Sequence, residues 1–168
     1  MSGLEGTILQ WCHRLQDTTF ATSLRESGYF YPLIEGSHVL GLALSVGTVM
    51  WFDLRLAGVA WKKSPVSAVF SQLRPIMLTG FGIMFVTGAL LFSARASEAF
   101  SSSYFRIKMA LLVLGGLNLA LFHVTIDRRR AEWDMDDPPP LGARVAGVVS
   151  LFLWFAVIAA GRIMAYNL

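Results

Sequence analysis

Apolar residues run almost without interruption through four stretches of the chain, and polar residues gather between them. The stretches are Val39 to Phe52, Ile76 to Phe92, Met109 to Ile126 and Val145 to Gly161. With its flanks, each reaches roughly 17 to 22 residues, against the about 20 that an α-helix needs to cross the hydrocarbon core. The pattern therefore predicts an all-α fold, a four-transmembrane-helix bundle with spans at about 33–58, 75–94, 106–126 and 144–166.

The segment before the first span has a different pattern, because its apolar residues recur at helical spacing among polar ones. Residues 6–15 carry Ile8, Leu9, Trp11, Cys12 and Leu15. This spacing predicts a short amphipathic helix lying in the membrane interface. A second short helix is expected from Thr19 to Glu26. We thus expect an amphipathic interfacial segment over residues 1–31 and the transmembrane domain over residues 32–168.

Composition supports a membrane location and narrows the classes of partner. Hydrophobic residues make up 55% of the chain and charged residues 15%, and the mean hydropathy is +0.56. The chain has 14 Lys and Arg against 11 Asp and Glu, and this small positive excess is typical of loops that anchor to anionic headgroups. We therefore expect the lipid bilayer as a partner, and we expect no binding of nucleic acid. The single cysteine, Cys12, excludes an internal disulfide and a CxxCH haem attachment.

The placement of cations predicts the orientation in the membrane. The loops after the first and third spans carry eight cations, namely Arg55, Lys62, Lys63, Arg74, Arg128, Arg129, Arg130 and Arg144, and the opposite side carries six. By the positive-inside rule, both termini then face the periplasm of a bacterial inner (cytoplasmic) membrane. No cleavable signal peptide is visible in residues 1–17, so we expect the first span to direct insertion into this multi-pass topology.

Candidate chemistry centres on the start of the first span, where Glu35 and His38 lie three residues apart and so on one helical face. That face continues through the small and polar residues Gly41, Ser45 and Thr48, which favours packing against another helix over contact with lipid. We therefore expect His38 to point inward. It is either hydrogen-bonded to a neighbouring helix or a metal ligand with Glu35 as its supporting carboxylate.

Further polar groups are expected at the depth of His38. Arg106, Lys108 and Met109 belong to the third span, and Arg162 belongs to the fourth. These cations could neutralise an anionic cofactor edge, pair with Glu35, or simply anchor the helix ends in the headgroup region. An ion pair between Glu35 and Arg162 is one specific expectation.

Two polar residues of the third span are assigned other roles. His123 lies near the end of that span opposite to His38, and a depth difference of roughly 20 Å at about 1.5 Å per residue prevents the two histidines from sharing one haem iron. We expect His123 to lie at the interface and Asn118 to make a hydrogen bond between helices.

Several short motifs resemble a family of small four-span bacterial inner-membrane proteins with no assigned function. They are Glu26-Ser27, Tyr29, Tyr31-Pro32, Ile34-Glu35-Gly36, His38, Asp53-Leu54-Arg55-Leu56, Phe105-Arg106-Ile107-Lys108, Ser150-Leu151, Leu153-Trp154, Gly161-Arg162 and Ala165-Tyr166. An early histidine in a span that ends in Asp-x-Arg is also similar to membrane domains of the copper-resistance and b-type cytochrome kind. This chain lacks the second inward histidine at matching depth.

Two classes of function follow. The first is an accessory or assembly subunit of a larger membrane complex, or a homo-oligomer, with no chemistry of its own and no enzymatic activity. The second is a redox, metal or haem-binding membrane module whose cofactor, haem b or copper, depends on His38 as ligand. An optical spectrum with metal analysis would discriminate between them.

Overall fold

The computed structural model describes residues 3–166, which form helices and turns without any strand in that range. Four helices are long and apolar enough to cross a membrane. They are α3 (Phe30–Leu56), α4 (Val66–Ala94), α6 (Ser103–Thr125) and α8 (Leu141–Tyr166). The predicted fold class, four long apolar helices preceded by a short helix, is therefore confirmed.

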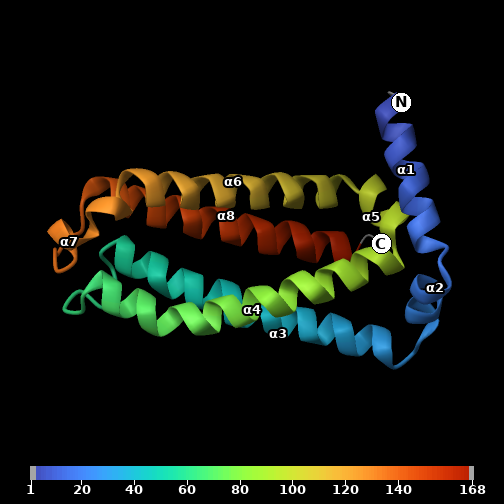
Figure 1. The fold of residues 1–168 in the computed structure, drawn as a ribbon, viewed down its shortest axis with the longest axis horizontal. Coiled ribbons are helices and arrows are strands. Elements are labelled where there is room, and N and C mark those ends of the chain that lie inside the picture. The colour runs from blue at the N-terminus through green and yellow to red at the C-terminus, as the bar shows by residue number, and fades with distance from the viewer. Residues whose placement is uncertain (1–2, 167–168) are drawn as a thin grey trace.

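The long helices form a bundle built from two pairs (Figure 1). α3 packs mainly against α4, α6 packs mainly against α8, and contacts between α3 and α8 join the two pairs. At this junction a Cβ on Gly147 of α8 would lie 2.8 Å from the backbone oxygen of Asp53 and 2.9 Å from Cβ of Leu56. The pairs therefore meet in backbone contact near the end of α3.

α3 and α4 also approach each other closely near the middle of the bundle. A Cβ on Gly80 would lie 2.9 Å from Cα of Ser45, and a Cβ on Gly41 would lie 2.9 Å from Cγ2 of Ile83. No side chain fits between such backbones, so glycine on each helix permits the crossing. This crossing fixes which α4 residues face the first turns of α3.

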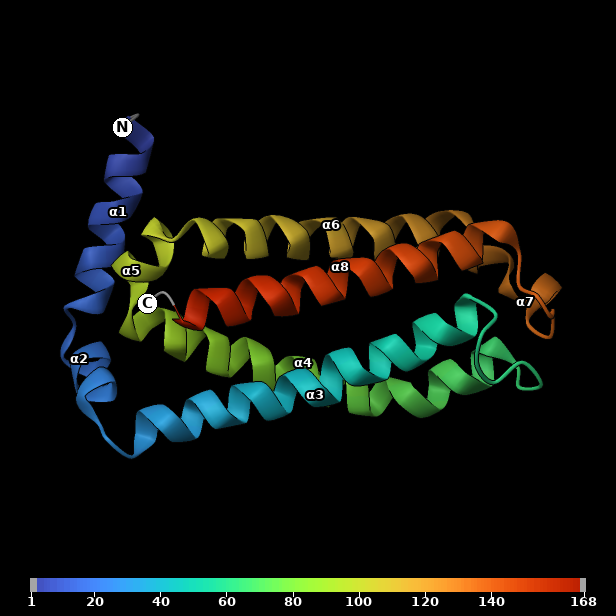
Figure 2. The same cartoon turned by 180° about the vertical axis from the view of Figure 1, so that it is seen from behind.

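Three short helices cover one end of the bundle. They are α1 (Gly3–Gln16), α2 (Thr19–Glu26) and α5 (Ala96–Ser101). α2 begins and ends at the predicted residues, and the hydroxyl of Thr18 accepts a hydrogen bond from Ala21 N at 3.3 Å to cap its start. Figures 1 and 2 show α1 lying across the bundle axis, as a helix in the membrane interface would.

The opposite end is closed by turns and by the short helices η1 (Asp127–Arg129) and α7 (Arg130–Trp133). Trp133 is buried there and donates its indole N–H to the carbonyl of Ile126 at 3.3 Å. With its neighbours it forms a buried apolar cluster, whose other members are Phe52, Leu56, Val66, Val69, Phe122 and Ala143. The acidic and proline-rich stretch before α8 is non-helical, because consecutive prolines lack the N–H donors that a helix needs.

The helix α4 starts at Val66, nine residues before the start near residue 75 that hydropathy indicated. Its first turns hold polar residues such as Gln72 and Arg74, and Pro75 lies inside the helix. The hydropathy estimate counted only residues suited to hydrocarbon. These polar turns extend the helix beyond the apolar stretch.

Candidate functional site

The candidate site is built on the end of the bundle covered by α1, α2 and α5. His38 lies on α3 two turns before the Ser45–Gly80 crossing, and Thr87 lies on α4 two turns after it. The backbone contact at the crossing therefore brings these two side chains together. Gly88 completes the fit, because a Cβ there would lie 3.2 Å from Cε1 of the His38 ring.

The hydrogen bonds around Thr87 define which nitrogen of His38 carries the proton. The Thr87 hydroxyl donates its only hydrogen to the carbonyl of Ile83 at 2.6 Å, so toward His38 it acts as an acceptor. Nδ1 of His38, 2.8 Å from Thr87 Oγ1, must then be the donor. His38 also makes a hydrogen bond to the backbone of Met84, so two residues of α4 hold the ring.

Lys108 of α6 lies against α8. Its side chain is partly buried, and its Cδ, Cε and Nζ pass within about 4 Å of where a Cβ on Gly161 of α8 would lie. Lys108 therefore packs between α6 and α8, and His38 packs between α3 and α4. Within the described range Lys108 has no carboxylate partner.

The other expected members of the constellation face away from His38 and Lys108. Glu35 and Met109 are exposed on their helices. Arg106 donates to the carbonyl of Phe100 at 3.2 Å and lies 3.7 Å from Glu5. Arg162 donates to the hydroxyl of Tyr166 at 3.2 Å. The expected Glu35–Arg162 ion pair does not form in the described structure.

His38 is therefore hydrogen-bonded to a neighbouring helix, as the first of the two expectations had it, and its partner is Thr87. Glu35, the supporting carboxylate of the metal-ligand expectation, does not bond to it in the described structure. Spacing within one helix correctly placed Glu35 on the same turn as His38. However, the hydrogen-bond partner comes from a second helix, and residue spacing carries no information about that. The only signal for Thr87 was a hydroxyl in an otherwise apolar span.

His123 lies at the other end of the molecule, in the last turn of α6 before η1. Its side chain is 73% exposed, and its Nδ1 lies 2.9 Å from Oδ2 of Asp127. Figure 1 places α2 and α7 at opposite ends of the bundle, so the two histidines are separated as predicted. Asn118 donates to the carbonyl of Ala146 on α8 at 3.0 Å, which confirms the expected hydrogen bond between helices.

Two buried charges near the end of α3 were not recognised as such from the sequence. Arg55 was counted among the loop cations, but its side chain is fully buried in the last turn of α3. It donates from Nε to the carbonyl of Ser64 at 3.0 Å and from Nη2 to the carbonyl of Asp136 at 3.4 Å. Asp53 is also buried, with Ser150 of α8 as its hydrogen-bonding neighbour. Arg55 therefore holds the α3–α4 turn against the connection that precedes α8.

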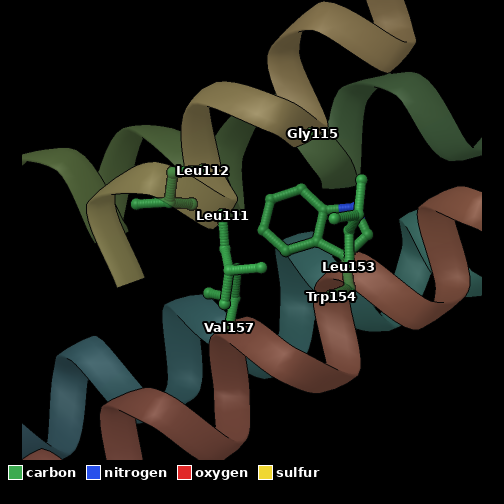
Figure 3. Close-up of a pocket in the computed structure, with 6 residues that line it drawn as sticks. All are labelled: Leu111, Leu112, Gly115, Leu153, Trp154 and Val157. Carbon is green, nitrogen blue, oxygen red and sulfur yellow. The ribbon is translucent and has the colours of Figure 1, made fainter. Parts of the chain in front are cut away.

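The described part of the bundle offers no cluster of metal ligands. Residues 3–166 contain no group of three or more His, Cys, Asp or Glu side chains that could hold a metal ion. Figure 3 shows a recess between α6 and α8, lined by Leu111, Leu112, Gly115, Leu153, Trp154 and Val157. It is apolar and too narrow to admit a water molecule, so we interpret it as a packing gap at Gly115.

Comparison with known proteins identifies a family but no activity. No curated protein and no solved structure matches the chain. A family model described as "Family of unknown function (DUF6644)" matches residues 17–167. This range includes α2, the four long helices and both candidate residues, His38 and Lys108. The chain therefore belongs to the DUF6644 family of unknown function.

Proposed function

We propose that the protein is an accessory or assembly subunit of a larger complex in a bacterial inner membrane, with no chemistry of its own. The observation that carries this proposal is the geometry of α1. This helix lies across the bundle axis and extends past α6 (Figures 1 and 2). One face of α1 carries four apolar residues at spacings of four, three and four: Leu4, Ile8, Trp11 and Leu15. In that order their side chains are 78%, 45%, 64% and 40% exposed.

The fixed position of α1 supports a docking role. The side-chain oxygen of Gln16 accepts hydrogen bonds from Ser97 N at 2.9 Å and Ser97 Oγ at 2.7 Å. Glu5 lies 3.7 Å from Arg106, and Cys12 is buried beneath the helix. Because both halves of α1 are attached to the bundle, its apolar face is presented in a defined direction. A preordered face loses little conformational entropy when a partner binds.

The inward polar groups also suit a structural role. His38 bonds to Thr87, Asn118 bonds to the backbone of α8, and Arg55 bonds to two turns. Each of these bonds joins one part of the bundle to another. In hydrocarbon such bonds hold helices together, since water is not available as a competing partner.

The second candidate function is a redox, metal or haem-binding module around His38. The specific observation that favours it is the hydrogen bond that orients Nδ1 of His38, as in many metal-ligating histidines. Haem b or copper would need further ligands from a partner subunit or a second copy. This candidate therefore also requires assembly.

Purification from native membranes in a mild detergent tests the first proposal. We expect the wild-type protein to co-purify with a stoichiometric membrane partner, and Trp11→Gln together with Leu15→Gln to lose that partner at unchanged protein yield. His13→Gln, exposed on the same helix but outside the apolar row, is the matched control.

Two outcomes of that purification would contradict the accessory role. The first is a wild-type protein that purifies without a partner. The second is a partner that the double variant retains, which would mean that the apolar row of α1 rests on lipid. Absorbance and metal analysis on the same wild-type sample test the second candidate, and a haem or copper signal that disappears in His38→Ala would favour it.

A further inference from the structure

The turn between α3 and α4 carries an exposed pair of stacked tryptophans. Figures 1 and 2 place this turn at the same end of the bundle as α7. The rings of Trp51, on α3, and Trp61, in the turn, have centroids 5.6 Å apart and an interplanar angle of 13°. They remain 51% and 43% exposed. Within residues 3–166 the indole N–H of Trp133 has a hydrogen-bond partner, whereas those of the stacked pair have none.

The backbone of Trp61 is strained, and the turn holds it in that conformation. Its φ is +49°, in the left-handed region that a bulky side chain rarely adopts. Such strain persists only where the surrounding structure imposes it, and it is concentrated at functional sites. Val59 N and Ala60 N both donate to the carbonyl of Leu54, at 3.0 and 3.2 Å, and Ser64 N donates to the carbonyl of Trp61 at 3.0 Å. The indole therefore has a defined position before any ligand binds.

Two unpaired cations follow the stack directly. Lys62 and Lys63 are exposed, and neither forms an ion pair or a hydrogen bond within residues 3–166. The acidic connection before α8 packs against the same turn, where a Cβ on Gly58 would lie 3.3 Å from Cδ of Pro139. Its carboxylates nevertheless form no ion pair with either lysine. The turn thus presents two positive charges beside an apolar surface that also carries N–H donors.

The depth of the stack matches the boundary between hydrocarbon and headgroups. α3 has 27 residues, which makes it about 40 Å long, so it exceeds the about 30 Å hydrocarbon core by about 5 Å at each end. Trp51 is five residues from the last residue of α3, about 7 to 8 Å along the helix axis. The stacked rings therefore lie at the hydrocarbon edge, where indoles are enriched. The lysines next to Trp61 reach the headgroup layer.

We propose that the stacked tryptophans and the two lysines bind one anionic phospholipid of the leaflet around this end of the bundle. The lysines contact the phosphate, the indole N–H groups donate to phosphate or ester oxygens, and the rings cover the start of the acyl chains. A free phosphate would use the lysines but not the rings. An acidic protein segment would not require rings at the hydrocarbon edge. The site lies at the opposite end from α1 and is independent of the accessory role.

Native mass spectrometry of the full-length protein, released from nanodiscs of phosphatidylcholine with a minor fraction of phosphatidylglycerol, tests the proposal. We expect the wild-type protein to retain phosphatidylglycerol in preference to phosphatidylcholine. Each lysine near an anionic headgroup favours binding by a factor of about 5, so Lys62→Gln combined with Lys63→Gln should lower retention about 10-fold or more. Trp61→Gly should also lower it, because glycine keeps the left-handed backbone and removes only the ring.

The matched control is Arg128→Gln combined with Arg129→Gln, which removes the same charge from exposed positions of η1 at this end of the bundle. It should retain the lipid. Melting temperatures give a second readout, because phosphatidylglycerol should stabilise the wild type and the η1 variant but not the lysine variant.

Four outcomes would overturn the proposal. The first is a wild-type protein without preference for phosphatidylglycerol, and the second is a lysine or Trp61 variant that retains the lipid. The third is an equal loss in the lysine and η1 variants, which would indicate only a diffuse surface potential. The fourth is displacement of the lipid by inorganic phosphate or by a co-purifying acidic protein.

Discussion

The carboxylate of Asp134 caps the N-terminus of α4 from a position 67 residues further along the chain. Its Oδ1 accepts from Ser67 N at 2.7 Å and its Oδ2 accepts from Ser67 Oγ at 2.6 Å, while its backbone oxygen accepts from Val66 N at 3.0 Å. The helix has Pro65 before its first residue, and Pro65 has no side-chain acceptor to offer. Asp134 supplies the acceptor and places a negative charge at the positive end of the helix dipole.

We expect Asp134→Ala to lower the free energy of unfolding by about 1–2 kcal/mol, the usual cost of losing an N-cap. Thermal unfolding of the detergent-solubilised protein measures this. Asp136→Ala is the control, because the hydrogen bonds of Asp136 use its backbone atoms, which alanine keeps. Equal melting temperatures for the two variants would show that the cap does not contribute to stability.

Arg55 provides a second prediction at the same end of the bundle. Arg55→Met removes donors to the carbonyls of Ser64 and Asp136, and each buried acceptor left unpaired costs about 1–3 kcal/mol. We expect a lower melting temperature and faster proteolytic cleavage in residues 57–65. Arg74→Met, at an exposed position of α4, should behave like wild type. Cleavage at the wild-type rate in the Arg55 variant would argue against its role in holding this turn.

Two glycines of α4 should respond oppositely to alanine. At Gly80 a Cβ would lie 2.9 Å from Cα of Ser45, whereas at Gly82 nothing lies within 4 Å. Gly80→Ala should therefore separate α3 from α4 and destabilise the bundle. Gly82→Ala should be neutral or stabilise it by up to about 1 kcal/mol through helix propensity. Melting temperatures of both variants check this, and a Gly80 variant as stable as the Gly82 variant would contradict the close crossing.

The orientation inferred from charge can be tested by labelling single cysteines in intact cells. Cys12 is buried and burial raises the pKa of its thiol, so it holds less reactive thiolate and should give a low background. Lys63 is exposed in the α3–α4 turn and is the labelling position for the cytoplasmic side. Ser67 is not suitable for this purpose, because its hydroxyl bonds to Asp134. We expect an impermeant maleimide to label Glu26→Cys and not Lys63→Cys. The reverse pattern would place the termini in the cytoplasm.

The sequence alone determined the main architecture. Runs of apolar residues long enough to cross a bilayer specify four long helices, because an unsatisfied backbone in hydrocarbon costs several kcal/mol and a helix satisfies its own. Local spacing also predicted α2 at Thr19–Glu26 and an inward His38, and a lone amide in an apolar span predicted the bond from Asn118 to a neighbouring helix.

Tertiary structure decided how each polar side chain is used. Arg106 and Arg162 turn outward while Lys108 turns inward, His38 bonds to Thr87 and not to Glu35, and Arg55 is buried although it was counted as a loop cation. The pattern along one helix fixes which residues share a face, but it does not fix which neighbouring helix that face meets. That depends on the glycine contacts at which α3, α4 and α8 cross, because these set the rotation and register of each helix against the next.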